Sequence, residues 1–309
     1  MRQAFIRTLC DLAAEDDRIF LLTGDLGYMV MEPFRDRFPR RFFNVGVAEQ
    51  NMIGIATGMA EAGLRPYAYS IAPFAVLRPF EFIRNGPVLH NLPVRIVGMG
   101  MGFDYGHAGP THYALEDIAT LRTLPGLAIV VPADSHQAAA AIRQTANLER
   151  PVYYSLGKDD HQSVPNLGGR FAQGKIQIVR TGGDIALVTM GSVSAEVVAA
   201  ADRLSAVGVE ATVAIVSGFS PDPVPDISEL LSGFRFAISI EAQTNTGGLG
   251  AFVSTVIASE SLQCRLKVLA VYHSPDGTSG SQSERWRKYG LDRESIMRNT
   301  LALMGKTSE

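Results

Sequence analysis

The chain has 309 residues, carries a formal net charge of −3, and is 46% hydrophobic and 19% charged. The length suggests two domains, and the composition excludes intrinsic disorder. No basic cluster marks a nucleic-acid surface, and the two cysteines are too few for a disulfide scaffold. Arg7 and Asp11 interrupt the first apolar segment, which argues against a signal peptide, and no apolar run reaches the roughly 18 residues of a membrane span. We therefore expect a cytoplasmic protein that binds neither nucleic acid nor membrane.

The first half of the chain alternates helical patterns with short apolar strands. The pattern around Phe5 and Leu9 predicts a helix over 2–15, and Asp134 and Ser135 are natural N-caps of a later one. The predicted strands are 19–23, 42–45, 65–71, 93–99, 127–132 and 151–156. The further predicted helices are 49–62, 75–89 and 134–148. This alternation indicates a mainly parallel sheet covered on both faces.

The second half repeats this pattern after a polar stretch. Residues 157–174 lack apolar periodicity and are rich in Gly, Asp, Pro and Asn, which is typical of a linker. The predicted strands here are 176–180, 184–190, 209–216, 235–240 and 266–272, and the predicted helices are 192–206, 226–232, 249–260 and 291–304. We expect an α/β protein with two domains, 1–160 and 175–309, joined by a linker at 161–174. Each domain is expected to hold a mainly parallel sheet flanked by helices.

Several motif readings are weak. The GMGMG segment at 98–102 has Phe103 where a dinucleotide fingerprint needs its third glycine. His107 and His112 share one loop, so a metal site there is left open, although no known metal spacing is matched. No G-x-S-x-G supports a serine nucleophile, and Cys10 is expected in the core.

Glu49 is the most informative single residue. It lies in the first turn of the predicted helix 49–62, directly after a strand, with Val47 and Met52 among its apolar neighbours and no Lys or Arg within six residues downstream. An acid in a first turn can simply complement the helix dipole. In apolar surroundings, however, a carboxyl group can hold or share a proton, so we expect acid–base chemistry at Glu49. Gly54 and Gly58 on the same helix are unfavourable unless another backbone packs closely there.

Two further segments point to the same region. Phe74 and Arg78 come just after a strand, and the polar loop 102–117 follows the next strand and contains Gly109-Pro110-Thr111-His112. Ligands of parallel sheets bind beyond the carboxyl ends of the strands. A loop with so many polar groups needs partners, so a polar ligand is expected.

In this order the motifs form a recognisable set. They are D-x-G (25–27), N-x-G-x-x-E (44–49), the P-F segment, G-P-T-H (109–112), V-x-P-A-D (130–134) and G-G-L-G (247–250). The whole chain resembles the C-terminal half of transketolase, that is, its pyrimidine-binding domain plus its C-terminal domain. The resemblance implies transfer of a two-carbon ketol unit between sugars or sugar phosphates, with thiamine diphosphate as the electron sink. Alternatives left open are the beta subunit of a 2-oxo acid dehydrogenase, a deoxyxylulose-phosphate-synthase-like enzyme, and a non-catalytic scaffold subunit.

The resemblance also implies roles around the cofactor. Glu49 would hydrogen-bond the aminopyrimidine ring and so promote loss of the proton from the thiazolium carbon. Phe74 would stack on the pyrimidine, with Tyr69 as a neighbour and Arg78 close by. Asp25 would lie near the cofactor across a subunit interface.

Substrate contacts are implied at four positions. His112 would contact the hydroxyl groups of the sugar, with His107 nearby, and Arg2 aligns with an arginine that binds substrate phosphate. The usual Asp before G-P-T-H is Ala108 here, and Lys158 stands close to where an arginine is expected. A lysine is a point charge without the fork of arginine, so the acceptor could be a modified or unphosphorylated sugar.

A partner chain is implied by what is missing. The G-D-G motif, which in this family binds the metal that bridges the diphosphate, does not occur in the sequence. The chain thus looks like one subunit of a split transketolase, and we expect Mg²⁺ and the diphosphate to be held by a second polypeptide in an α2β2 assembly. The Gly54 and Gly58 face is a natural part of that interface. In the second half, Glu241 is expected at an interface or turn, and Trp286 and Arg287 fit either surface packing or partner contacts.

Overall fold

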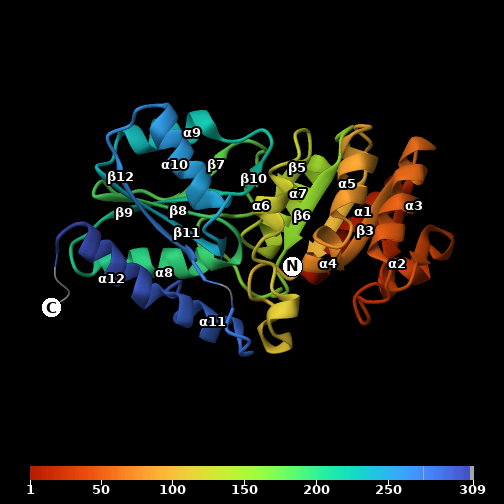
Figure 1. The fold of residues 1–309 in the computed structure, drawn as a ribbon, viewed down its shortest axis with the longest axis horizontal. Helices are drawn as coiled ribbons and strands as arrows, with labels where there is room; N and C mark the ends of the chain where they lie inside the picture. The colour runs from red at the N-terminus through yellow and green to blue at the C-terminus, as the bar shows by residue number, and fades with distance from the viewer. Residues whose placement is uncertain (274, 307–309) are drawn as a thin grey trace.

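Two sheets lie side by side in the computed structural model, which describes residues 1–273 and 275–306 (Figure 1). Each sheet is mainly parallel and is flanked by helices. This confirms the predicted α/β fold class, whereas the boundaries 1–160, 161–174 and 175–309 stay predictions. Within the described residues, no helix has both the length and the apolar character needed to cross a bilayer.

The N-terminal sheet has seven strands in the order β10-β5-β6-β4-β3-β1-β2. Its parallel strands are β1 (Ile19–Thr23), β2 (Phe42–Asn44), β3 (Arg65–Ile71), β4 (Arg95–Met99), β5 (Ala128–Val130) and β6 (Val152–Leu156). The helices between them are α1 (Arg2–Glu15), α2 (Glu32–Arg37), α3 (Glu49–Glu61), α4 (Ala72–Val76), α5 (Phe80–Ile83), α6 (Asp117–Leu121) and α7 (Ser135–Thr145). Because the strands run parallel, the loops that follow them meet at one edge of the sheet.

The path between β3 and β4 differs from the single helix predicted over 75–89. The chain forms α4, then α5, then a π-helical turn at Arg84–Val88. Pro79 stands at the N-cap of α5 and Pro87 lies inside the π-helical turn. Proline lacks a backbone donor and clashes with the preceding turn, so one straight helix cannot form here. The resulting bend leaves Arg78 between α4 and α5.

The C-terminal sheet has five strands in the order β12-β11-β8-β9-β7. They are β7 (Ile176–Arg180), β8 (Ile185–Thr189), β9 (Ala211–Val216), β11 (Phe236–Thr244) and β12 (Arg265–Val271), of which β7 is antiparallel to β9. The helices are α8 (Ser194–Ser205), α9 (Val224–Ser232), α10 (Leu249–Ser259), α11 (Gln282–Tyr289) and α12 (Arg293–Leu303). In Figure 1, α9 and α10 cover one face of this sheet, and α8 and α12 cover the other.

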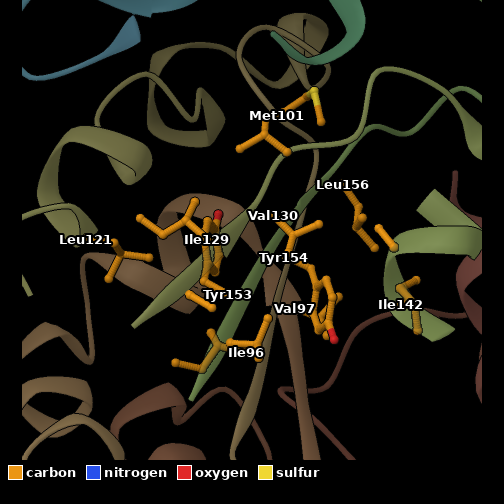
Figure 2. Close-up of a cluster of buried hydrophobic side chains, with 14 of the residues drawn as sticks. Ile96, Val97, Met101, Leu121, Ile129, Val130, Ile142, Tyr153, Tyr154 and Leu156 are labelled. Carbon is orange, nitrogen blue, oxygen red and sulfur yellow. The ribbon is translucent and has the colours of Figure 1, made fainter. Parts of the chain in front are cut away.

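The core of the N-terminal sheet is built from its central strands. Figure 2 shows side chains of β4, β5 and β6 packed together with neighbouring helices, among them Ile96, Val97, Ile129, Val130, Tyr153, Tyr154, Leu121 and Ile142. These side chains are almost completely buried. Removal of roughly 25 cal/mol per Å² of apolar surface from water makes this core the main source of stability. It holds the strand ends, and thus the loops after them, in fixed positions.

A short strand from the second half of the chain completes the first sheet. β10 (Gly218–Phe219) pairs antiparallel with β5, at the edge of the N-terminal sheet. A Cβ at Gly218 would lie 2.5 Å from the carbonyl oxygen of Ile129, so this close approach requires glycine. The side-chain amide of Gln173 donates a 2.8 Å hydrogen bond to the carbonyl of Phe219. The two halves of the chain therefore share one sheet edge.

Candidate active site

Glu49 begins α3, and its carboxylate is buried at the carboxyl edge of the N-terminal sheet, with 1% of the residue exposed. Ser70 in β3 donates a 2.9 Å hydrogen bond to Oε1, and Arg78 donates a 3.0 Å hydrogen bond to Oε2. A Cβ at Gly24 would lie 3.3 Å from Oε1, so the chain after β1 closes a further side. The expectation of a niche without a nearby cation is wrong, because Arg78 reaches Glu49 from a distant segment.

Arg78 connects Glu49 to two other predicted site residues. Its guanidinium carbon lies 3.9 Å from the centre of the Phe74 ring. The ring of His112 meets the ring of Phe74 edge-on, with 5.1 Å between their centres. The structure thus brings Glu49, Phe74, Arg78 and His112 into one cluster at the edge where the strands end. Phe74 and His112 are half-buried, so part of each ring is accessible to a ligand.

Asp25 lies on the rim beside this cluster. Its Oδ1 accepts hydrogen bonds of 2.8 Å from Asn44 and 2.9 Å from Tyr28. These hydrogen bonds lower the pKa of Asp25, which keeps the carboxylate charged. Asn44 also accepts from the backbone N–H groups of Asp25 and Gly46, so the turns after β1 and β2 are tied together. Asp25 is exposed, and its contact across an interface stays a prediction.

Tyr69 lies in the core of the N-terminal sheet. Its ring stacks on Phe5 of α1 with 5.6 Å between the ring centres, and burial raises the pKa of Tyr69 well above its usual value. Successive residues of a strand point to opposite faces, so Tyr69 faces away from the side on which Ser70 reaches Glu49. A contact between Tyr69 and a cofactor stays a prediction.

A second group of charged residues adjoins His112. Tyr105 lies 6.2 Å from His112 between ring centres, and the ammonium group of Lys158 lies 4.2 Å from the centre of the Tyr105 ring. Burial and the positive charge of Arg2 lower the pKa of Lys158, so the two predicted substrate cations are close together. Burial raises the pKa of Asp104 to about 7. This arrangement can attract a negatively charged group next to His112.

His107 is exposed in a short 3₁₀ turn just before the G-P-T-H segment. In the part of the chain that the structure describes, no three His, Cys, Asp or Glu side chains are arranged to hold a metal ion. The hypothesis of a metal at His107 and His112 therefore finds no support there. The hydroxyl of Thr111 lies 2.9 Å from Nδ1 of His112 and orients that ring instead.

The outer face of α3 is open. A Cβ added at Gly54 or Gly58 would meet nothing within 4 Å. Ile55 and Phe82 are exposed on this side, and a hollow of about 350 Å³ is lined by Gly54, Thr57, Glu81, Phe82, Asn85 and Gly86. Figure 1 shows α3 at the end of the molecule that is remote from the C-terminal sheet. Exposed apolar side chains around a stripe of glycine are typical of a surface that another backbone covers.

Three residues of the site were not predicted. Ser70 was assigned only to a strand, although a lone hydroxyl within a buried strand is a signal that it contacts a polar group. Asp104 and Tyr105 lie in the polar loop that was predicted, but their contacts with Lys158 depend on how β4 and β6 pair. Such contacts between distant segments leave no local pattern in the sequence.

Glu241 is not at an interface or turn, as was predicted. It is fully buried in β11, and its carboxylate accepts hydrogen bonds of 2.7 and 2.8 Å from the backbone of Leu249 and Gly250 at the start of α10. Burial raises the pKa of Glu241 to about 7. A Cβ at Gly248 would lie 2.2 Å from this carboxylate, which explains the close packing of the G-G-L-G segment. Trp286 is buried within this chain.

Comparisons with known proteins agree with this geometry. The transketolase pyrimidine binding domain matches residues 1–162, and the transketolase C-terminal domain matches residues 174–296. A putative transketolase C-terminal section from Methanocaldococcus jannaschii is 33% identical over 309 residues, which cover 99% of this chain and 96% of that relative. One of the two subunits of an apulose-4-phosphate transketolase from Phocaeicola vulgatus is 30% identical over 309 residues, covering 99% of this chain and 97% of that relative.

A solved structure leads to the same family. It is described as a split gene transketolase in an inactive beta4 tetramer, and it superposes with a TM-score of 0.87 at 30% identity, covering 99% of this chain and 98% of that one. These matches along the full length favour a split transketolase over the three alternatives left open by the sequence. The chain belongs to the transketolase family and is the beta-type subunit of a split transketolase.

Proposed function

We propose that this subunit, together with a second polypeptide, transfers a two-carbon ketol unit between sugars or sugar phosphates, and that Glu49 activates the cofactor. The observation that carries the proposal is the buried Glu49 carboxylate next to the half-exposed faces of Phe74 and His112. A single buried acid beside an aromatic platform suits a heteroaromatic ring that offers one basic nitrogen.

The residues fit the pyrimidine end of thiamine diphosphate. Glu49 would hold a proton at the ring nitrogen, Phe74 would stack on the ring, and Asp25 would lie at the rim. When bound, thiamine diphosphate supplies the electron sink for carbanion chemistry. The described residues offer no carboxylate cluster for Mg²⁺, so the metal and the diphosphate are assigned to the partner chain.

Arg78 has to change partners when a ring occupies this site. At present it covers one face of Phe74 and binds Oε2 of Glu49. Its side chain is 41% exposed, so it can turn outward without breaking the core. This movement would free Oε2 of Glu49 and the Phe74 face together.

The substrate is proposed to be a sugar with an anionic end. His112 would donate to or accept from its hydroxyl groups, while Arg2 and Lys158 would face a phosphate. His107 is exposed and would contribute only from the rim. The relative from Phocaeicola vulgatus is named for a phosphorylated sugar, which supports this class. Ala108 removes a carboxylate that would otherwise repel a phosphate.

We also propose that the open face of α3 meets the diphosphate-binding subunit in an α2β2 heterotetramer. Gly54 and Gly58 would allow the partner backbone to approach closely. The solved beta tetramer of a split transketolase is described as inactive, which supports the need for a second kind of chain. A cytoplasmic location stays a prediction.

The test is reconstitution with the partner subunit. The chain is co-expressed with the gene next to its own, the complex is purified with thiamine diphosphate and Mg²⁺, and ketol transfer is measured with ketose donors. We expect Glu49→Gln to lower kcat by roughly 100-fold or more. Glu61→Gln, at the far end of the same helix, is the matched control and should retain activity. A complex that keeps full activity with Glu49→Gln would mean that the site is not catalytic.

A further inference from the structure

The loop that carries His112 is held at both ends by acidic residues. It leaves β4, runs through residues 102–116 and enters α6 at Asp117. Asp104 lies near its start and Asp117 at its end. Each acid bonds to β6 or to the chain just after it, and each also contacts a glutamine side chain from the part of the chain that matches the transketolase C-terminal domain.

At the start of the loop, Asp104 accepts a 2.7 Å hydrogen bond from the backbone N–H of Lys158. Its other carboxylate oxygen accepts from the side-chain amide of Gln282, the first residue of α11. Next to it, Phe103 stacks on Tyr289 at the other end of α11, with 5.1 Å between the ring centres. The loop is therefore tied to α11 by a polar contact and by an aromatic one.

At the end of the loop, Asp117 is buried and accepts hydrogen bonds of 2.6 Å from Tyr153 and 3.0 Å from Ser155. Gln243 of β11 reaches the same carboxyl group. The amide of Gln243 also donates a 3.0 Å hydrogen bond to the carbonyl of Ala114, in the loop itself. Gln243 is buried, so these polar groups have no water to replace a lost partner.

Backbone contacts support the same attachment. Thr244 N–H donates to the carbonyl of Leu115 at 2.9 Å, and Gly280 N–H donates to the carbonyl of Gly106 at 3.1 Å. A Cβ at Gly106 would lie 2.2 Å from the carbonyl oxygen of Gly280, so the two segments pack without space for a side chain. In Figure 1 the yellow loop lies against α11. The middle of the loop, with His112, spans between these anchors.

We propose that Gln282 and Gln243 are positioning residues, through which the C-terminal domain fixes the loop that presents His112 to the substrate. The proposal rests on the proposed function, because it takes His112 as a substrate contact. Neither glutamine touches the substrate, and each acts through the loop. This gives the C-terminal domain a defined part in the reaction.

The first test is kinetic and uses the reconstituted complex. We expect Gln282→Ala and Gln243→Ala each to raise the KM for the sugar substrate by roughly tenfold, because small misplacements of a binding group cost affinity, while the affinity for thiamine diphosphate stays unchanged. Gln177→Ala is the matched control, since Gln177 is also buried and hydrogen-bonded, to Ser217 and Gln137, but lies on β7. An unchanged KM in both variants would overturn the proposal.

A double-mutant cycle shows whether the glutamines act through His112. If they do, adding Gln282→Ala to His112→Ala should cost no more than His112→Ala alone. Full additivity would overturn the proposal and leave the proposed function intact. Loss of any effect of His112→Ala, or absence of transfer activity in the wild-type complex, would instead contradict the proposed function.

The second test needs no activity. Hydrogen exchange of the backbone amides of residues 105–113 is measured by mass spectrometry in the complex. Gln282→Ala, which removes a half-buried contact, should accelerate exchange there by roughly tenfold without changing exchange in β8 or β9. Exchange equal to that of the wild type would overturn the proposal, even if Gln243→Ala fails to fold.

Discussion

The guanidinium of Arg78 donates a 3.0 Å hydrogen bond to the carboxylate of Glu49, although the two residues are 29 positions apart. The carboxylate is 1% exposed and the arginine side chain is 41% exposed. Burial of a carboxylate is costly unless it is paired and hydrogen-bonded. The pairing therefore keeps the proposed catalytic acid buried until a ligand arrives.

Replacement of Arg78 by methionine tests this pairing. We expect the free energy of unfolding of the chain to fall by roughly 1–3 kcal/mol, because Glu49 loses its charged partner while the exposure of Arg78 limits the cost. The measurement is urea unfolding at pH 8. Arg84→Met is the control, since the Arg84 guanidinium contacts the neighbouring Asn85 in an exposed position. Equal losses in the two variants would show that the ion pair adds no stability.

Phe74 offers a test of the aromatic platform. We expect Phe74→Leu to weaken thiamine diphosphate binding in the complex by about three- to tenfold, because leucine keeps the apolar contact but loses the ring face. Isothermal titration with thiamine diphosphate and Mg²⁺ gives the dissociation constant. Phe80→Leu on the neighbouring α5 removes the same atoms and should bind normally. Unchanged binding by Phe74→Leu would exclude stacking at this ring.

The open face of α3 yields opposite outcomes for a small and a large substitution. Gly54→Ala should raise the free energy of unfolding by roughly 0.5–1 kcal/mol, because alanine favours helix and its Cβ meets no atom within 4 Å. Gly54→Trp should fold but fail to assemble with the partner in size-exclusion chromatography with light scattering. Ala14→Trp, on the exposed side of α1, is the control and should assemble. Normal assembly of Gly54→Trp would place the interface elsewhere.

Glu241 predicts a pH dependence of stability. Burial raises its pKa from 4.5 to about 7, so between these pH values the folded chain keeps a proton that the unfolded chain releases. Stability therefore falls as the pH rises through this window and changes no further above it. Relative to Glu241→Gln, which does not titrate, the wild type should lose up to about 3 kcal/mol. Urea unfolding of both at pH 4.5 and 7.5 checks this, and a constant difference would contradict it.

Much of the fold follows from local patterns in the sequence. The helix at Arg2–Glu15 and the strands at Ile19–Thr23 and Arg65–Ile71 begin and end where the spacing of apolar residues predicts. Asp134 caps α7 as predicted, accepting a 2.8 Å hydrogen bond from the backbone of Gln137. Short elements such as α2 and α11 were missed because they carry too few apolar residues to show a period.

The contacts of the site follow less directly. The motifs around Glu49, Phe74 and His112 predicted that these residues meet, because all follow strands of one parallel sheet. The pairing of Arg78 with Glu49 depends on the bend at Pro79, and the burial of Glu241 depends on α10 docking on β11. Both are tertiary effects that a local pattern does not encode.

The two-residue strand β10 has a consequence for anyone who shortens this polypeptide. A fragment ending before Gly218 would leave the N–H and C=O groups of β5 without their neighbour, and a bare sheet edge is a template for pairing with other molecules. We expect such fragments to clump in solution, so transplanting this scaffold into another enzyme means moving both of its halves as one unit.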